Sequence, residues 1–182
     1  GIYLKSNHPS GYLSTNIYPV PKLENPFLGV HYTITVDGGI KIGPTAIPAF
    51  WREQYKGLEN FNTSEFFEIL IRQLSLAATS KFGFKKLAAE EMLKYYKPNM
   101  IKRAIKLCSG FNEKSFNCWS TPGIRAQLVN AREKKLEMDF VIEGDDKSLH
   151  VLNAVSPAFT CSIPFSKYVV DRIEILTNMG NL

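Results

Sequence analysis

One alternating ribbon, NPFLGVHYTITVDGGIKIGP at Asn25–Pro44, constrains the fold of this chain more than any other segment. Successive side chains of a strand point to opposite faces, so the alternation of apolar and polar residues predicts two half-buried strands. The glycines between them predict a hairpin with a three-residue loop, Asp37–Gly39, in which Gly39 takes the left-handed conformation. This loop pairs Val36 with Ile40. It gathers the apolar side chains on one face: Val30, Tyr32, Ile34, Val36, Ile40 and Ile42.

The opposite face of the predicted hairpin is polar and carries His31, Thr33, Thr35 and Lys41. An imidazole, two hydroxyl groups and an ammonium group in one row suit a solvated sheet surface. They equally suit the wall of a binding site, where a few polar groups converge. The residue types by themselves leave both interpretations open.

The rest of the chain has a strand-rich first third, a helical middle and a last third that returns to strands and ends in helix. In the middle, Asn62 followed by Glu65 predicts a capped helix start. Near the end, Ser156-Pro157 predicts another helix start, and Pro164 a break into two helices. Strands are expected at Gly1–Leu4, Asn16–Tyr18, Gly29–Val36, Ile40–Gly43, Gly123–Val129, Asp139–Glu143 and Ser148–Asn153, and helices at 62–83, Phe84–Tyr96 and Asn99–Ser109.

The first of these helices has apolar residues at helical spacing, which predicts a stripe buried in the core. The stripe consists of Phe67, Leu70, Ile71, Leu74 and Ala78. The order of elements along the chain predicts an α+β fold, with a mostly antiparallel mixed sheet and a helical insert at about 62–109.

The charge and the reactive side chains argue against several classes of function. The net charge of +5 comes from scattered Lys and Arg with no run of five, so no nucleic-acid partner is expected. Three cysteines without a C-x-x-C pair and three histidines without H-E-x-x-H indicate neither a disulfide framework nor a metal site. The chain also has no G-x-G-x-x-G motif, no P-loop and no apolar run of 18 residues.

Three blocks of the sequence resemble one enzyme family: NIYPVPKLENPFLGVHYTITVDGGIKIGPTAIPAFWREQY, PGIRAQ and HVLNAVSPAFTCSIP. They are similar to the C-terminal half of the FAD-dependent L-2-hydroxyglutarate oxidases, or dehydrogenases, of the D-amino-acid-oxidase-like (DAO) flavoprotein superfamily. Family members begin with a Rossmann-type FAD-binding half, whereas this chain lacks its glycine motif and begins at Gly1. We therefore expect a partial chain. It would comprise a DAO-type substrate-binding domain at residues 1–152 and a helical segment at 153–182 that returns to the FAD-binding domain.

The resemblance implies an oxidoreductase that converts a 2-hydroxy acid, most like L-2-hydroxyglutarate, to 2-oxoglutarate with hydride transfer to FAD. His31 is the candidate catalytic base, because an imidazole titrates near the operating pH. Arg125 is the candidate partner of the substrate carboxylate, and Thr33, Lys41 and Arg52 are further candidates for substrate binding. A helix N-terminus in NAVSPAFT would stabilise the reduced flavin. The candidate cofactor-binding residues are therefore Asn153, Ser156, Pro157, Ala158 and Thr160.

Two alternatives stay open. Besides an enzyme that acts on L-2-hydroxyglutarate, the chain could be a non-catalytic, stand-alone ligand-binding module derived from this domain. It could also be part of a related flavin enzyme that oxidises an amino acid or glycerol 3-phosphate. The expected partner is a small 2-hydroxy dicarboxylate; we also expect peripheral membrane contact through an electron acceptor, and self-association of the fragment. The expected location is the bacterial cytoplasm or the cytoplasmic side of a membrane, or the mitochondrion in a eukaryote. This chain alone is expected to be inactive, since the missing half would bind most of the FAD.

Overall fold

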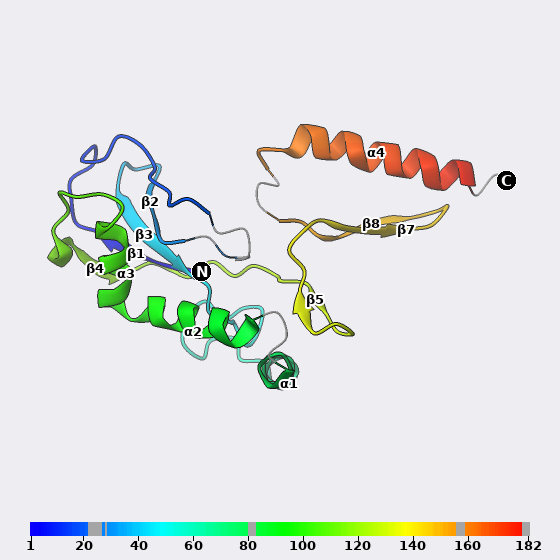
Figure 1. Cartoon of the computed structure of the whole chain (residues 1–182), viewed down its shortest axis with the longest axis horizontal. Helices are drawn as coiled ribbons and strands as arrows, with labels where there is room; N and C mark the ends of the chain where they lie inside the picture. The colour runs from blue at the N-terminus through cyan, green and yellow to red at the C-terminus, as the bar shows by residue number, and fades with distance from the viewer. Residues whose placement is uncertain (22–26, 28, 80–82, 156–158, 180–182) are drawn as a thin grey trace. The chain divides into compact units, whose positions relative to one another are not determined.

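The computed structural model of the chain describes residues 1–21, 27, 29–79, 83–155 and 159–179. Their contacts group into two compact units, an N-terminal unit at Gly1–Arg125 and a C-terminal unit at Ala126–Leu182. Both units contain helices and small antiparallel sheets, as Figure 1 shows. The predicted α+β class is therefore confirmed. The DAO-type topology and the domain division between residues 152 and 153 stay predictions.

The N-terminal unit is built on a four-stranded antiparallel sheet with the strand order β2-β3-β1-β4. Its strands are β1 (Ile2–Ser6), β2 (His31–Ile34), β3 (Ile40–Thr45) and β4 (Phe116–Trp119). The first three correspond to predicted strands, and the predicted strand at Asn16–Tyr18 is reduced to one bridge. The sequence does not predict β4, because FNCW is only four residues long and contains Asn117, a residue type that is depleted in strands.

The β2–β3 hairpin has the predicted faces but a different register. Ile34 pairs with Ile40, and a tight turn closes through a 2.8 Å hydrogen bond from the Gly38 N–H to the Thr35 carbonyl. Gly38, with a φ of 77°, takes the left-handed position that ends the loop, one residue earlier than predicted. The predicted pairing of Val36 with Ile40 is therefore wrong. The shift amounts to two residues, so each side chain keeps its face of the hairpin, but Val36 lies in solvent.

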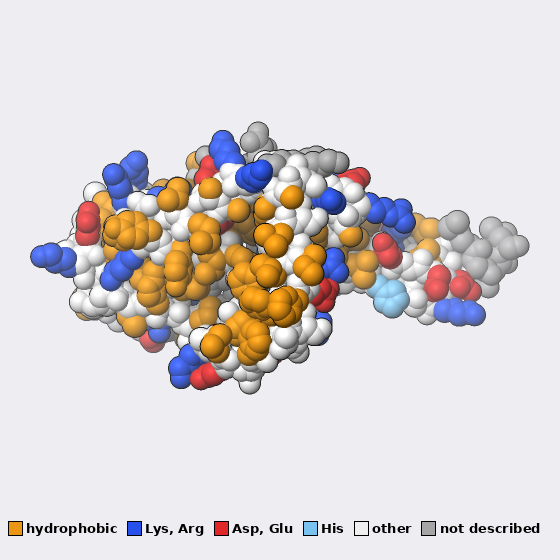
Figure 2. Space-filling model, turned by 90° about the horizontal axis from the view of Figure 1, so that it is seen from below, with side chains coloured by type: hydrophobic (Ala, Val, Ile, Leu, Met, Phe, Trp, Pro, Cys, Tyr) orange, Lys and Arg blue, Asp and Glu red, His pale blue; other side chains and the backbone are white. Residues whose placement is uncertain are grey.

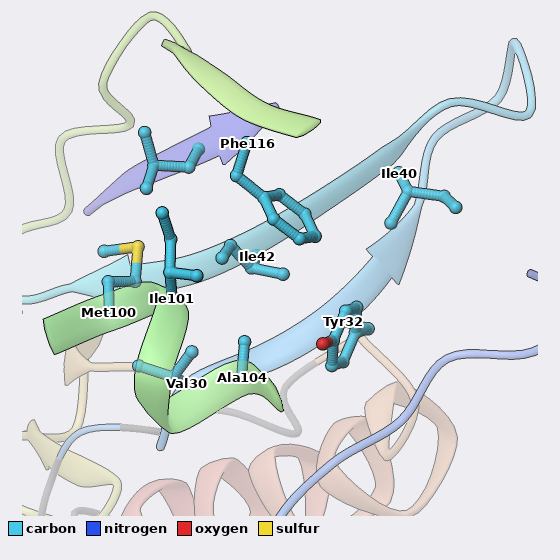
Figure 3. Close-up of a cluster of buried hydrophobic side chains, with 9 residues drawn as sticks. Val30, Tyr32, Ile40, Ile42, Met100, Ile101, Ala104 and Phe116 are labelled. Carbon is cyan, nitrogen blue, oxygen red and sulfur yellow. The ribbon is translucent and has the colours of Figure 1, made fainter. Parts of the chain in front are cut away.

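The hydrophobic core lies between the apolar face of this sheet and helix α3, which spans Lys97–Ile105 (Figure 3). α3 begins two residues before the predicted helix, and it contributes its buried face to the core. The core consists of Leu4, Val30, Tyr32, Ile40, Ile42, Met100, Ile101, Ala104 and Phe116. Because the core occupies one face of the sheet, the other face is left for polar side chains.

Helices α1 (Thr63–Thr79) and α2 (Phe84–Tyr95) agree with the predicted helices. The Oδ1 atom of Asn62 accepts a hydrogen bond from the Glu65 N–H at 3.1 Å, which confirms the predicted cap. The Glu65 carboxylate does not complete a capping box. It accepts from the backbone N–H of Arg52 at 2.8 Å instead, and so ties the start of α1 to the loop after β3.

The predicted burial of the apolar stripe on α1 is wrong for most of its members. Phe67, Ile71 and Leu74 are 54%, 64% and 60% exposed, whereas Leu76 is buried. The reason is that α1 packs on α2 and makes few contacts with the sheet that carries the core. Figure 2 shows hydrophobic side chains gathered on one face of the molecule.

A buried ion pair lies within α2, and its carboxylate also binds the residue after β3. The Nζ atom of Lys94 donates to the Oε1 atom of Glu91, and the two side chains are 4% and 2% exposed. The second carboxylate oxygen of Glu91 accepts from the backbone N–H of Ala46 at 2.9 Å. Both oxygens of this carboxylate are therefore engaged inside the protein.

The C-terminal unit holds two short hairpins and one long helix. These are β5 (Val129–Asn130) with β6 (Lys135–Leu136), β7 (Val141–Gly144) with β8 (Leu149–Asn153), and α4 (Ser162–Met179). α4 packs on this unit through Phe165, whose ring stacks on that of Phe140 at 4.3 Å between centroids. No helix among the described residues is long and apolar enough to cross a membrane.

Two predictions for the last third of the chain are wrong. The predicted strand at Gly123–Val129 forms a ladder only at its last residue, because its partner β6 is two residues long and reaches no further than Val129. Pro164 does not break α4, since it is the third residue of the helix, where an N–H would have no intrahelical acceptor. The predicted helix start at Ser156-Pro157 lies outside the described residues, and a turn at 159–161 leads into α4.

Candidate functional site

The sheet face opposite the core carries aromatic and cationic side chains. We call it the polar face, and its members are Tyr3, Lys5, His31, Thr33 and Lys41. β3 lies between β2 and β1, so Lys41 pairs with Thr33 on one side and with Lys5 on the other. The structure thus brings together three predicted site residues: His31, Thr33 and Lys41.

His31 is 3% exposed and is held by the backbone and by two rings. Its Nδ1 atom lies 2.9 Å from the Gly29 carbonyl oxygen, and because a carbonyl only accepts, Nδ1 must donate the proton. Tyr18 stacks on the imidazole at 4.5 Å between ring centroids, and Tyr3 meets it edge-on at 6.1 Å. In the neutral ring this hydrogen bond leaves the lone pair on Nε2.

The protonation of His31 follows from its burial. Desolvation disfavours the charged imidazolium and lowers the pKa of His31 below its usual 6.5. The hydrogen bond to Gly29 opposes this shift, and the positive charge of Lys41 adds to it. The imidazole is therefore neutral at pH 7, which is the form that can accept a proton.

Tyr3 connects the imidazole to the ammonium group of Lys41. The Nζ atom of Lys41 lies over the Tyr3 ring, 4.4 Å from its centroid, which is a cation–π contact. Burial, with a smaller effect of Tyr18, raises the pKa of Tyr3, so its phenol stays neutral. Gly43, opposite His31, makes room for this ring, since a Cβ there would lie 2.9 Å from Cδ1 of Tyr3.

The two predicted arginine ligands have different surroundings. The side chain of Arg52 is 87% exposed, and its Nε atom pairs with Glu65 at 3.4 Å, so it belongs to the start of α1. Arg125 is exposed, and the strand predicted around it does not form. Its charge helps to lower the pKa of the Gly1 amino group, after the larger effect of burial, so it lies near the first residue of the chain.

Three contributors to this site are missing from the sequence-based prediction: Tyr3, Lys5 and Tyr18. The alternation in IYLKS would place Tyr3 and Lys5 on the face opposite the buried Leu4, so a signal for both exists. Tyr18 has no comparable local signal. It is positioned by the bridge between its neighbour Ile17 and β2, which is a long-range contact.

The predicted flavin-binding residues are only partly described. The side chain of Asn153 is buried and donates from Nδ2 to the Asp139 carbonyl at 2.7 Å, so it serves the C-terminal unit itself. Thr160 lies in the turn before α4. Ser156, Pro157 and Ala158 lie outside the described residues. Of the predicted flavin-binding residues that the structure describes, Asn153 is therefore engaged by the backbone of its own unit.

The described residues contain no cluster of three or more His, Cys, Asp or Glu side chains that could hold a metal ion. The three cysteines are thiols, of which Cys118 is exposed and Cys108 and Cys161 are partly buried. The chemistry available on the polar face is that of one neutral imidazole, one neutral phenol, one hydroxyl group and two ammonium groups.

Comparison with known proteins finds that the chain is similar to part of several enzymes that share one name. It is 34% identical over 187 residues to the mouse mitochondrial L-2-hydroxyglutarate dehydrogenase, which covers 96% of this chain and 38% of the mouse protein. Identity to the Escherichia coli K12 L-2-hydroxyglutarate dehydrogenase is 31% over 160 residues, or 88% of this chain and 37% of that protein. Identity to the enzyme of the same name from Indibacter alkaliphilus is 36% over 171 residues, which are 90% of this chain and 40% of that protein. No family model matches.

These relatives share one name, and most of this chain aligns with each of them. It is therefore a homologue of part of the L-2-hydroxyglutarate dehydrogenases, which confirms the resemblance seen in the sequence. The chain spans less than half the length of the curated relatives it matches.

Proposed function

We propose that this chain supplies the substrate-facing sheet of an oxidoreductase that acts on a 2-hydroxy dicarboxylate, most like L-2-hydroxyglutarate. The observation that supports this most is the state of His31. Its imidazole is buried and neutral, and its hydrogen bond to Gly29 leaves the Nε2 lone pair as the site that can take a proton. The similarity to L-2-hydroxyglutarate dehydrogenases supports the proposed class of substrate.

In this proposal, His31 removes the hydroxyl proton of the substrate through Nε2 while the α-carbon gives up its hydride, so two electrons and two hydrogen atoms leave together. FAD, expected from the resemblance, supplies the hydride acceptor when bound. Lys41 binds a substrate carboxylate, with Lys5 adding positive charge, and Thr33 offers a hydroxyl group beside them. Arg125 is the proposed partner of the second carboxylate.

Arg52 is the weakest of the proposed substrate ligands, since it is paired with Glu65. Peripheral membrane contact through an electron acceptor, self-association, and a cytoplasmic or mitochondrial location stay predictions. The exposed apolar stripe of α1 supports the expectation of self-association, because isolated apolar patches of this kind tend to be covered.

A second candidate is a ligand-binding module without catalysis. It is favoured by Asn153, whose amide is engaged by backbone carbonyl groups and is not presented to a cofactor. A flavin enzyme that oxidises an amino acid or glycerol 3-phosphate is a third candidate. Assays of the intact protein with each substrate, at matched concentrations, separate the three candidates. Turnover of L-2-hydroxyglutarate alone supports the first, turnover of another substrate the third, and binding without turnover the second.

The role of His31 is tested with H31N in the intact protein and with H150N as the matched control, because His150 is exposed on β8. Loss of a general base typically lowers the rate about 10²–10⁴-fold. We expect H31N to lower kcat in this range and H150N to leave it unchanged. Equal activity of H31N and the unsubstituted protein would refute the role of His31 as base.

A further inference from the structure

The segment between Glu91 and Glu113 has a marked charge bias. It contains no acidic residue but five basic ones: Lys94, Lys97, Lys102, Arg103 and Lys106. Lys94 is neutralised by the buried pair with Glu91. The other four lie on α3 or at its C-terminal end, and so give this part of the N-terminal unit a positive surface.

Three of these cations line a surface groove of about 410 Å³ between α2 and α3. The lining residues are Leu93, Asn99, Lys102, Arg103 and Lys106. Positions 99, 102, 103 and 106 follow helical spacing, so they form one face of α3, while its other face is in the core. The volume is within the range of small-molecule sites, which is about 300–1,000 Å³.

The groove wall is fixed by a hydrogen bond within the protein. The Nδ2 atom of Asn99 donates to the Leu93 carbonyl at 3.3 Å and so joins the end of α2 to α3. An amide nitrogen carries two hydrogens, so Asn99 retains donor capacity beyond this bond. The groove is therefore lined by hydrogen-bond donors and one apolar side chain.

Lys102, Arg103 and Lys106 form no ion pair with a described carboxylate, although the structure pairs other surface cations, such as Lys56 with Glu59. Cations in the last turn of a helix interact favourably with its dipole, which explains one or two of them. The dipole does not offset the mutual repulsion of three cations that line one groove. Like charges at i and i+4, as for Lys102 and Lys106, destabilise a helix. A bound anion would remove this repulsion.

We propose that this groove binds a phosphate-bearing anion. A guanidinium fork fits phosphate oxygens in a bidentate way, and two ammonium groups on the same face supply further charge. The Asn99 amide adds a neutral donor, and Leu93 covers the apolar part of the ligand. The groove is made of α2 and α3 and shares no residue with the polar face, so this inference is independent of the proposed function. The phosphate comes either from a free small molecule or from a lipid headgroup.

The test is calorimetric titration of the intact protein with inorganic pyrophosphate at low ionic strength. We expect saturable binding at one site that weakens as salt is added. We expect R103A to lower the affinity roughly 10- to 100-fold. This is the loss that corresponds to charge-assisted hydrogen bonds of about 1.5–3 kcal/mol. K102A/K106A should lose affinity at least ~10-fold by the same reasoning. R103K, which keeps the charge without the fork, should fall between R103A and the unsubstituted protein.

The matched control is K85A/K86A, which removes two exposed cations of α2 outside the groove. It should bind pyrophosphate as the unsubstituted protein does. Vesicles of phosphatidylglycerol or phosphatidylcholine distinguish the two sources of phosphate. Sedimentation with phosphatidylglycerol vesicles that R103A abolishes indicates a lipid headgroup, and pyrophosphate binding without sedimentation a free ligand. The proposal is overturned if neither probe binds saturably, or if K85A/K86A loses as much affinity as K102A/K106A.

Discussion

The buried pair of Glu91 and Lys94 should respond to mutation in a way that an exposed pair does not. In E91Q the Lys94 ammonium, whose side chain is 4% exposed, loses its counter-charge. Breaking a buried pair by removing one partner typically costs about 3–5 kcal/mol. A domain is stable by only about 5–15 kcal/mol, so this loss is a large fraction of the total.

The double variant separates the charge from the hydrogen bond. Glu91 also accepts from the Ala46 N–H, and a glutamine oxygen can keep this bond. E91Q/K94M removes both charges while keeping the acceptor, so we expect it to lie within ~1 kcal/mol of the unsubstituted protein. E91L/K94M should be worse by about 1–3 kcal/mol, because the Ala46 N–H is then buried without a partner.

Urea unfolding followed by tryptophan fluorescence measures these differences, since Trp51 is 2% exposed in the same unit. E68Q is the control, because the Glu68–Arg72 pair has side chains 60% and 52% exposed, and such pairs contribute about 0–1 kcal/mol. Destabilisation of less than ~1 kcal/mol in E91Q would contradict the reasoning from burial. So would an E91Q/K94M variant as unstable as E91Q.

Three further predictions concern the site and the C-terminal unit. Because burial lowers the pKa of His31, kcat/KM should fall as the pH drops through a value below 6.5. The neutral ring should contribute its full stability above pH 6.5, and this contribution should be lost as the pH falls from 6.5 to the pKa of His31 in the folded protein. Urea unfolding at a series of pH values measures this loss. G43A should destabilise by about 1–3 kcal/mol in urea unfolding, since φ is 146° there and a Cβ would lie 2.9 Å from Tyr3, whereas G123A has open space and should be neutral. N153A leaves backbone carbonyl groups of the C-terminal unit without their amide donor and should lower its stability by about 1–3 kcal/mol in thermal unfolding, and an unchanged melting temperature would contradict this.

Local patterns predict which face a side chain takes better than they predict its pairing. The alternation around His31 and Lys41 identifies the polar face, because any even shift in register preserves it. The actual register depends on whether Gly38 or Gly39 takes the left-handed conformation. Both glycines can do so, and the hydrogen bonds of the turn decide in favour of Gly38.

Long-range contacts explain what the sequence does not predict. The ring of Tyr18 lies on His31 only because its neighbour bridges to β2, and nothing in YPVP indicates this partner. The strand predicted around Arg125 does not form, and the N–H of the nearby Gly123 bonds to the carbonyl of Gly1 at the start of the chain, a contact that no local pattern indicates. The stripe on α1 has the spacing of a core helix, yet periodicity cannot show whether a sheet lies opposite it.

α1 is only loosely tied to the cooperative unit that the sheet and α3 form. A helix gains most of its stability from burial of its apolar face, and Phe67, Ile71 and Leu74 contribute little of it here. Its backbone amides should therefore exchange with solvent through local opening, at a free energy well below that of global unfolding. The amides of α3, whose Met100 and Ala104 are fully buried, should exchange only when the core itself opens.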